Sequence, residues 1–156
     1  MNRALRILYG HITAGVLLVS AACGESVVGP VLELDPEVEA FVEQLTAHRA
    51  SVGCAPLTWN WSVAEVALGH SLDMVQRDFF DHVNPDGATP FDRLRTAGVE
   101  FSSSAENIAY GYPTGTAVLT AWLNSPGHRD NIENCVLTEH GVGFEGTHWT
   151  HLFINP

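Results

Sequence analysis

Residues 125–132, Ser-Pro-Gly-His-Arg-Asp-Asn-Ile, constrain the fold more than any other stretch of the chain. Pro126 lacks the backbone N–H that a continuing helix needs, and Gly127 allows backbone conformations that other residues resist. The segment therefore predicts the end of one helix, a tight turn and the start of another helix. His128 falls on that turn, so we expect the backbone to direct its imidazole.

Three more His or Glu residues lie near similar breaks in the pattern. His82 follows two phenylalanines and comes just before the turn signal Asn-Pro-Asp-Gly at residues 84–87. Glu106 lies in a largely apolar segment, where a buried carboxylate needs a cation, a histidine or backbone amides as partners. A role for Glu106 that only ties backbone groups together is equally open. We expect one polar cavity to contain His82, Glu106, His128 and His148.

The first 22 residues have the composition of an export signal. Residues 1–6 carry two arginines and no acid, and residues 12–22 are apolar but too short to span a bilayer. Small residues precede Cys23, as in bacterial lipoproteins. We expect residues 1–22 to be a signal peptide and Cys23 to become the lipidated first residue; plain secretion is the alternative. Residues 23–34 are then a tether, and residues 35–156 form one domain of an extracytoplasmic protein.

The remaining chain is strongly acidic. Without residues 1–22 it has five arginines and no lysine against 18 acidic residues, a formal charge of −13. This balance argues against a nucleic-acid partner and against binding to anionic lipid through a basic patch. Membrane attachment is therefore expected only through Cys23. The charge would suit a bound cation, although an acidic surface without a ligand is also common.

Two cysteines remain once Cys23 is assigned to a lipid. In an oxidising compartment Cys54 and Cys135 are expected to pair. Such a disulfide closes a long loop and is worth about 3–5 kcal/mol in the chain-entropy model. Two buried free thiols are the alternative.

Apolar spacing and capping residues predict a layered α/β (α+β) domain rather than a doubly wound sheet. His70 lies on an apolar helix face, and we expect it to be a packing residue. In the last strand His148, Thr150 and Leu152 face one side, and Trp149, His151 and Phe153 face the other. The expected helices cover about residues 36–52, 62–77, 90–97 and 113–125, and the expected strands cover residues 139–145 and 148–155.

Six spaced motifs together resemble the bacterial CAP (SCP-like) family, named after cysteine-rich secretory, antigen-five and pathogenesis-related proteins. The match extends over residues 38–154. The resemblance implies a three-layer α-β-α sandwich with a cavity of histidines and glutamates. The motifs are HSLDM at 70–74, FFDH at 79–82, NPDG at 84–87, AENIA at 105–109, SPGHR at 125–129 and WT at 149–150.

The resemblance also implies site residues. His82 matches the histidine ahead of the glutamate segment, Glu106 matches the glutamate of the Glu-Asn motif, and His148 resembles the histidine of the family's His-Phe-Thr-Gln strand. Many eukaryotic members have a second glutamate after the helix tryptophan. Bacterial relatives have Ser-Pro-Gly-His there instead, so His128 is the implied fourth cavity residue. His151 replaces a usual glutamine.

Imidazoles and a carboxylate are suitable ligands for zinc or another divalent cation. The four residues come from separate segments, so the metal expectation rests on the family's cavity. The first expected function is a binding or interaction module with an ion in the cavity and a lipid or protein partner. The second is a metal-assisted hydrolase with Glu106 as base or ligand, although no serine or cysteine has a recognisable nucleophile motif. The third is a structural envelope domain whose His/Glu cluster is a hydrogen-bond network.

Overall fold

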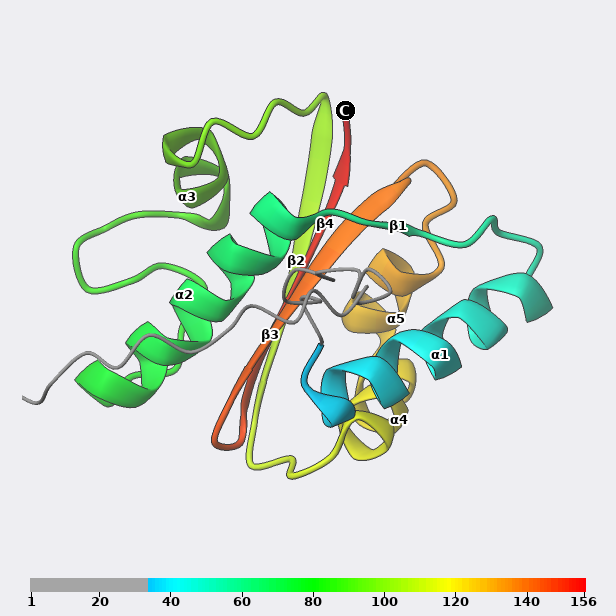
Figure 1. Ribbon diagram of the computed structural model, residues 1–156, viewed down its shortest axis with the longest axis horizontal. Helices are drawn as coiled ribbons and strands as arrows, with labels where there is room; N and C mark the ends of the chain where they lie inside the picture. Colours follow the sequence, from blue (N-terminus) through cyan, green and yellow to red (C-terminus); the bar gives the residue numbers. More distant parts are fainter. Residues whose placement is uncertain (1–33) are drawn as a thin grey trace, which may run out of the picture. The chain divides into compact units, whose positions relative to one another are not determined.

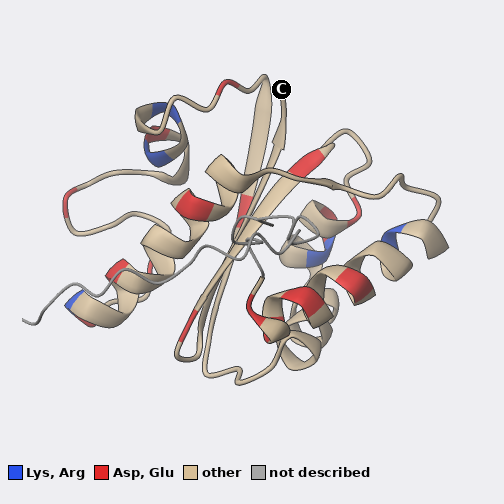
Figure 2. Ribbon diagram, in the orientation of Figure 1, with Lys and Arg blue, Asp and Glu red and all other residues tan. Residues whose placement is uncertain are grey.

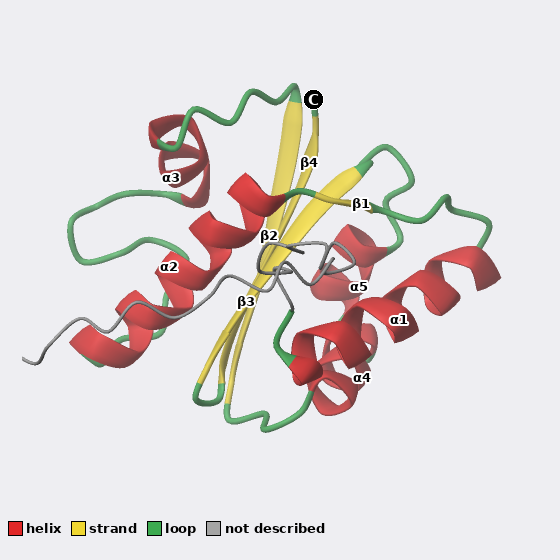
Figure 3. Cartoon of the chain, in the orientation of Figure 1, coloured by secondary structure: helices red, strands yellow, loops and turns green. Residues whose placement is uncertain are grey.

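The computed structural model of the chain describes residues 34–156. The expected signal peptide, Cys23 and the tether up to residue 33 lie outside this range. None of the helices within it has the length and hydrophobicity of a membrane span. Described by itself, this unit contains five helices and four strands (Figure 3). They are α1 Pro36–Ser51, β1 Thr58–Trp59, α2 Trp61–Arg77, α3 Pro90–Thr96, β2 Ser103–Tyr110, α4 Gly115–Leu123, α5 Pro126–Ile132, β3 Glu139–Glu145 and β4 His148–Asn155.

Side-chain caps start most of these helices where the sequence predicts. Asp35 accepts a hydrogen bond from the backbone N–H of Glu37 at the start of α1. Thr89 and Asp92 form a reciprocal capping box at the start of α3. These caps satisfy backbone donors that have no partner inside the helix, which is why the predicted starts are accurate here.

The sheet has the strand order β1-β3-β4-β2. The short β1 pairs with β3 in parallel, whereas β3, β4 and β2 are antiparallel neighbours. Helix α2 packs on one face against β3 and β4, and helices α1, α4 and α5 lie on the other (Figure 1). The predicted three-layer α-β-α sandwich is confirmed, and it leaves β2 as an edge strand.

Strand β4 separates the two halves of the core by its alternation. Trp149 and Phe153 pack with Phe41 of α1 in the larger apolar cluster. Leu152 and Ile154 pack with Val63 and other residues of α2 in the smaller cluster. Because successive side chains of a strand point to opposite faces, one strand contributes to both clusters.

Two glycines of β3 allow α2 to approach the sheet closely. A Cβ at Gly141 would overlap the backbone of Ala64, and a Cβ at Gly143 would overlap the backbone of Leu68. Glycine is required at both positions because these neighbours are helix backbone, which cannot rotate away as a side chain can.

Residues 125–132 differ from the expected conformation. Ser125 ends the segment after α4, Pro126 is the first residue of α5, and His128 lies inside that helix rather than on a tight turn. Proline is well accommodated at a first helical position, where its missing N–H would have had no intrahelical partner. Gly127 does not adopt a positive φ. The expected strands also did not include β2, which begins at Ser103.

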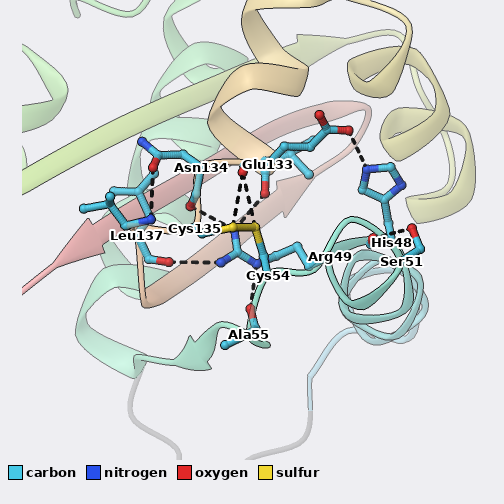
Figure 4. The surroundings of a disulfide bond; sticks show 11 residues. His48, Arg49, Ser51, Cys54, Ala55, Glu133, Asn134, Cys135 and Leu137 are labelled. Atoms are coloured by element: carbon cyan, nitrogen blue, oxygen red, sulfur yellow. Dashed lines mark hydrogen bonds and ion pairs between the residues drawn. A yellow bond between two sulfur atoms is a disulfide. The ribbon is translucent and has the colours of Figure 1, made fainter.

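A disulfide joins Cys54 and Cys135, which confirms the predicted pair (Figure 4). It ties the loop after α1 to the loop after α5. The buried Arg49 holds the same loops together through donation to the backbone oxygens of Ala55, Ile132, Asn134 and Leu137. Burial lowers the pKa of Arg49. Four carbonyl acceptors compensate this buried cation in place of a carboxylate.

Candidate functional site

The site is centred on Glu106 of the edge strand β2. Alternation along this strand turns Asn107 toward α5 and Glu106 toward α3. The Glu106 side chain is only 2% exposed, yet both of its oxygens have partners. His82 Nδ1 lies 2.8 Å from Oε1, and Arg93 Nη2 of α3 donates to Oε2 at 2.6 Å. A buried carboxylate is thus balanced by a guanidinium and an imidazole.

Arg93 also holds the loop that carries His82. Its Nη1 donates to the backbone oxygens of His82 and Ala88, at 2.9 and 3.1 Å. One guanidinium therefore joins the carboxylate to both ends of the loop before α3. The planar fork of arginine suits this arrangement, since it donates in several fixed directions at once.

The pKa values of His82 and His70, the two histidines near this carboxylate, shift in opposite directions. The hydrogen bond to Glu106 raises the pKa of His82, whose side chain is 49% exposed. Burial lowers the pKa of His70, and the charge of Arg93 lowers it further. His70 Nε2 lies 3.0 Å from the backbone oxygen of Asp81 and so contacts the loop that carries His82. This position agrees with the packing role expected for His70.

His128 approaches the group from α5. Its backbone oxygen accepts from Asn107 Nδ2 at 3.0 Å, and Asn131 Nδ2 donates to Asn107 Oδ1 at 2.8 Å. These asparagines attach α5 to β2. Burial lowers the pKa of His128, and the charge of the neighbouring His82 lowers it further. The imidazole of His128 is thus largely neutral at neutral pH.

A cavity of about 310 Å³ opens beside His128. Four of its nine lining residues are aromatic, and Ser125 and His128 contribute polar side-chain groups. Ser125 Oγ lies 2.8 Å from His128 Nδ1 instead of capping α5. The lining residues are Phe80, Ile108, Ala109, Tyr110, Tyr112, Ala121, Trp122, Ser125 and His128.

The structure does not bring His148 to the other three predicted residues. The strand register pairs Glu106 with Leu152 and Tyr110 with His148. Four residues along a strand correspond to about 13 Å, so His148 lies well away from Glu106. Its ring packs instead on Tyr110, with the ring centroids 4.5 Å apart. Sequence order alone could not reveal this separation, because it depends on how β2 pairs with β4.

His151 belongs to the core and not to the cavity. Its Nε2 lies 3.0 Å from Nδ1 of His140, and both rings are buried among aromatic side chains. Burial lowers the pKa of His140 to about 4 and holds the pKa of His151 well below its usual range. The two imidazoles thus form a neutral hydrogen-bonded pair.

The arrangement does not fit a ready metal centre. Within residues 34–156 no three His, Cys, Asp or Glu side chains are placed to hold one ion. Glu106 already has the cationic Arg93 on one oxygen and His82 on the other. A divalent ion would have to displace Arg93 from the carboxylate before Glu106 became its ligand. Metal binding by His82, Glu106 and His128 therefore stays a prediction.

Sequence reasoning missed three residues that build the site. Arg93 has no motif of its own, and only the fold brings α3 against β2. Asn107 follows Glu106 directly, but its role depends on α5 packing beside it. Ser125 carried a usable signal, because residues three apart at a helix start lie on the same side and Ser125 precedes His128 by three.

This three-layer domain, in which His82 of a loop pairs with Glu106 of the edge strand, defines the chain as a protein of the SCP/CAP class. The sequence model described as "CAP: Cysteine-rich secretory protein family" matches residues 42–151. The chain belongs to this family, which confirms the resemblance found from its motifs.

Two curated relatives from Bacillus subtilis (strain 168) are similar to the chain. The "uncharacterized membrane protein YlbC" is 42% identical over 106 residues, which are 68% of this chain and 31% of that protein. The "uncharacterized protein YkwD" is 39% identical over 115 residues, which are 72% of this chain and 45% of that protein. The chain thus spans less than half the length of each.

Solved structures show the same fold. An extracellular protein of Bacillus anthracis that contains an SCP domain is 36% identical, with a TM-score of 0.74 over 76% of this chain and 40% of that chain. An outer surface protein of Borrelia burgdorferi is 20% identical, with a TM-score of 0.73 over 80% of this chain and 96% of that chain. The second likeness supports the fold alone.

Proposed function

We propose that this chain is an extracytoplasmic binding module that takes its ligand in the cavity between β2, α4 and α5. The predicted signal peptide and lipidated Cys23 support export and membrane attachment. The Cys54–Cys135 disulfide suits an oxidising compartment. A relative of known structure is described as extracellular. In addition to the ligand in the cavity, we expect the protein to bind a lipid or a protein partner.

One observation carries the proposal: an open aromatic cavity lies beside a polar network in which both carboxylate oxygens of Glu106 already have partners. Its volume of about 310 Å³ lies within the range of small-molecule sites. Arg93 and His82 occupy the two oxygens of Glu106, so neither oxygen is free to contact a substrate and Glu106 is poorly placed to act as a general base. The network instead fixes the cavity wall, which favours binding over turnover.

Ligand-observed NMR with a mixed set of neutral, cationic and anionic small molecules tests the module. We expect some members to bind the wild-type chain and to lose binding in Tyr110→Ala. Tyr110 lines the cavity but is 60% exposed, so its removal should leave the fold intact. Binding of no compound, or equal binding by both proteins, would contradict the proposed function.

Zinc is a separate ligand class for the same module. Titration calorimetry with Zn²⁺ should show binding to wild type that weakens at least tenfold in His82→Ala. His148→Ala is the matched control, because His148 lies away from Glu106. Equal zinc affinity in wild type and His82→Ala would show that the predicted cluster is not the metal site.

Hydrolysis is a second candidate because of one contact, the hydrogen bond between Ser125 and His128 at 2.8 Å on the cavity wall. A neutral His128 could take the Ser125 hydroxyl proton at Nδ1 while Oγ bonds to an acyl carbon; the bond from that carbon to the leaving group would then break, and His128 would pass the proton to the leaving group. Water would hydrolyse the resulting acyl ester and restore the Ser125 hydroxyl. Labelling with a fluorophosphonate probe tests this. Modification of wild type at Ser125, and none in Ser125→Ala, would favour the hydrolase over the binding module.

A further inference from the structure

An exposed row of rings borders the cavity. The ring centroids of Phe80 and Tyr110 are 6.3 Å apart, and those of Tyr110 and His148 are 4.5 Å apart. The planes within each pair are inclined by 45° and 31°. Phe80 is 50% exposed and Tyr110 is 60% exposed, although both rings are large and apolar. Adjacent aromatic rings left in solvent are typical of a recognition surface rather than of a core.

The row continues into the cavity, where the hydrogen-bonding groups are uncharged. Phe80 and Tyr110 line the cavity together with Ser125 and His128. The Ser125 hydroxyl can donate or accept, and burial together with the nearby His82 lowers the pKa of His128 so that its ring is largely neutral. Such groups suit a ligand that is rich in hydroxyls or amides.

The distribution of charged residues around the cavity limits the chemical class of ligand that it can bind. Among the described residues, none that lines the cavity is a Lys, Arg, Asp or Glu. The five arginines of the described part are spread over α1, α2, α3 and α5 among many acids (Figure 2). Nucleic-acid bases also stack on rings, but their phosphates need cationic neighbours that this surface lacks. A cationic ligand would have no carboxylate in the lining to pair with.

A saccharide matches both halves of this surface. Each sugar ring has an apolar face of C–H groups that can stack on an aromatic ring, and it has neutral hydroxyl or acetamido groups at its edge. We propose that the chain binds a neutral glycan, whose ring faces lie on Phe80, Tyr110 and His148 and whose polar groups reach Ser125 and His128. This inference rests on the proposed binding function and names its ligand class.

The test uses the full chain and four probes: the tetrasaccharides chitotetraose, cellotetraose and maltotetraose, and tetramethylammonium. Heteronuclear NMR titration should show saturable binding of at least one glycan. Tyr110→Ala should weaken it at least tenfold, whereas Tyr110→Trp should retain it. Phe91→Ala is the matched control, since Phe91 is an exposed aromatic residue that does not line the cavity.

The outcomes separate this inference from the proposed function. If other small molecules bind at Tyr110 but no glycan does, or if tetramethylammonium binds in its place, the glycan assignment is wrong and the binding module stands. Equal glycan binding in wild type and Tyr110→Ala would also overturn the assignment. If no compound of any class binds at the cavity, both proposals are wrong.

Discussion

At the scale of single residues, two histidine clusters in this chain have opposite electrostatic environments. Glu106 stabilises the protonated form of His82 and raises its pKa. Within residues 34–156 no carboxylate partners the buried pair of His140 and His151, and the charge of Arg49 disfavours their protonation further. The first cluster can respond to pH at the surface, whereas the second makes the core sensitive to acid.

We expect the free energy of unfolding to fall as the pH drops below about 6.5. Below that pH the histidines of the unfolded chain bind protons, whereas the buried His140 and His151 of the folded chain stay neutral. His140 alone, with a pKa of about 4, lowers the free energy of unfolding by about 2 kcal/mol at pH 5. His151→Gln keeps a hydrogen-bonding partner for His140 and removes one titrating ring, so its loss between pH 7.5 and pH 5 should be smaller than that of wild type.

Urea unfolding at the two pH values measures this difference. His148→Gln is the control, because His148 is only partly buried and its removal should leave most of the pH dependence in place. If His151→Gln loses as much stability on acidification as wild type, the buried pair is not the source of the acid sensitivity.

Glu106→Gln should lower the pKa of His82 and destabilise the fold by about 3 kcal/mol, since Arg93 keeps its buried charge without an anion. The stabilisation from His82 is fully present below the unfolded pKa of about 6.5 and is lost as the pH rises through the raised folded value. This pH-dependent loss of stability should be absent from Glu106→Gln. NMR titration of His82 and urea unfolding measure the two effects.

Glu133→Gln is a matched control for this prediction. Glu133 also contacts a histidine, His48, at 2.9 Å, but both side chains are partly exposed. Exposed ion pairs contribute about 0–1 kcal/mol, so the control should change stability little. Equal effects of the two substitutions would contradict a special role for the buried carboxylate.

At the scale of elements, the close contact between α2 and β3 requires glycine, which has no side chain, at two positions of β3. Gly141 and Gly143 bring the strand against the backbone of α2, and Ser71 of α2 donates to the backbone oxygen of Gly143 at 3.0 Å. This close layer helps to position α2 and, after it, the loop with His82. The alternation of β4 then places its own side chains correctly on both faces.

Gly143→Ala should destabilise the domain by about 3 kcal/mol, because the added methyl group overlaps the backbone near Leu68 and the helix must move. Gly69→Ala, on α2 itself, has open space around the new Cβ and should stabilise by about 0.5–1 kcal/mol. Thermal unfolding of both variants checks the pair. A Gly143→Ala protein as stable as wild type would refute the close approach.

At the scale of the whole molecule, the described unit is a domain that relatives carry within longer chains. It matches less than half of each curated relative, and its own α-β-α layers contain two apolar clusters. The disulfide joins loops 81 residues apart in the sequence. It therefore restrains most of the described chain in the unfolded state.

The Cys54→Ser/Cys135→Ser double variant should lose about 4.5 kcal/mol of stability, the value that the chain-entropy model gives for a loop of this length. Arg49 still joins the same loops in that variant, so we expect a folded protein with a lower melting temperature. Calorimetry with and without a reducing agent measures the change. Equal melting temperatures for oxidised wild type and the double variant would contradict this role.

The sequence alone determined most of the elements and the class of fold, because these depend on local capping, alternation and spaced motifs. The starts of α1 and α3, the bounds of β3 and β4, the Cys54–Cys135 pair and the family were all predictable in this way. The tertiary structure decided which residues meet. Strand register separated His148 from Glu106, and the packing of α3 and α5 against β2 brought in Arg93 and Asn107. Such contacts join distant segments, and no local pattern of side chains encodes them.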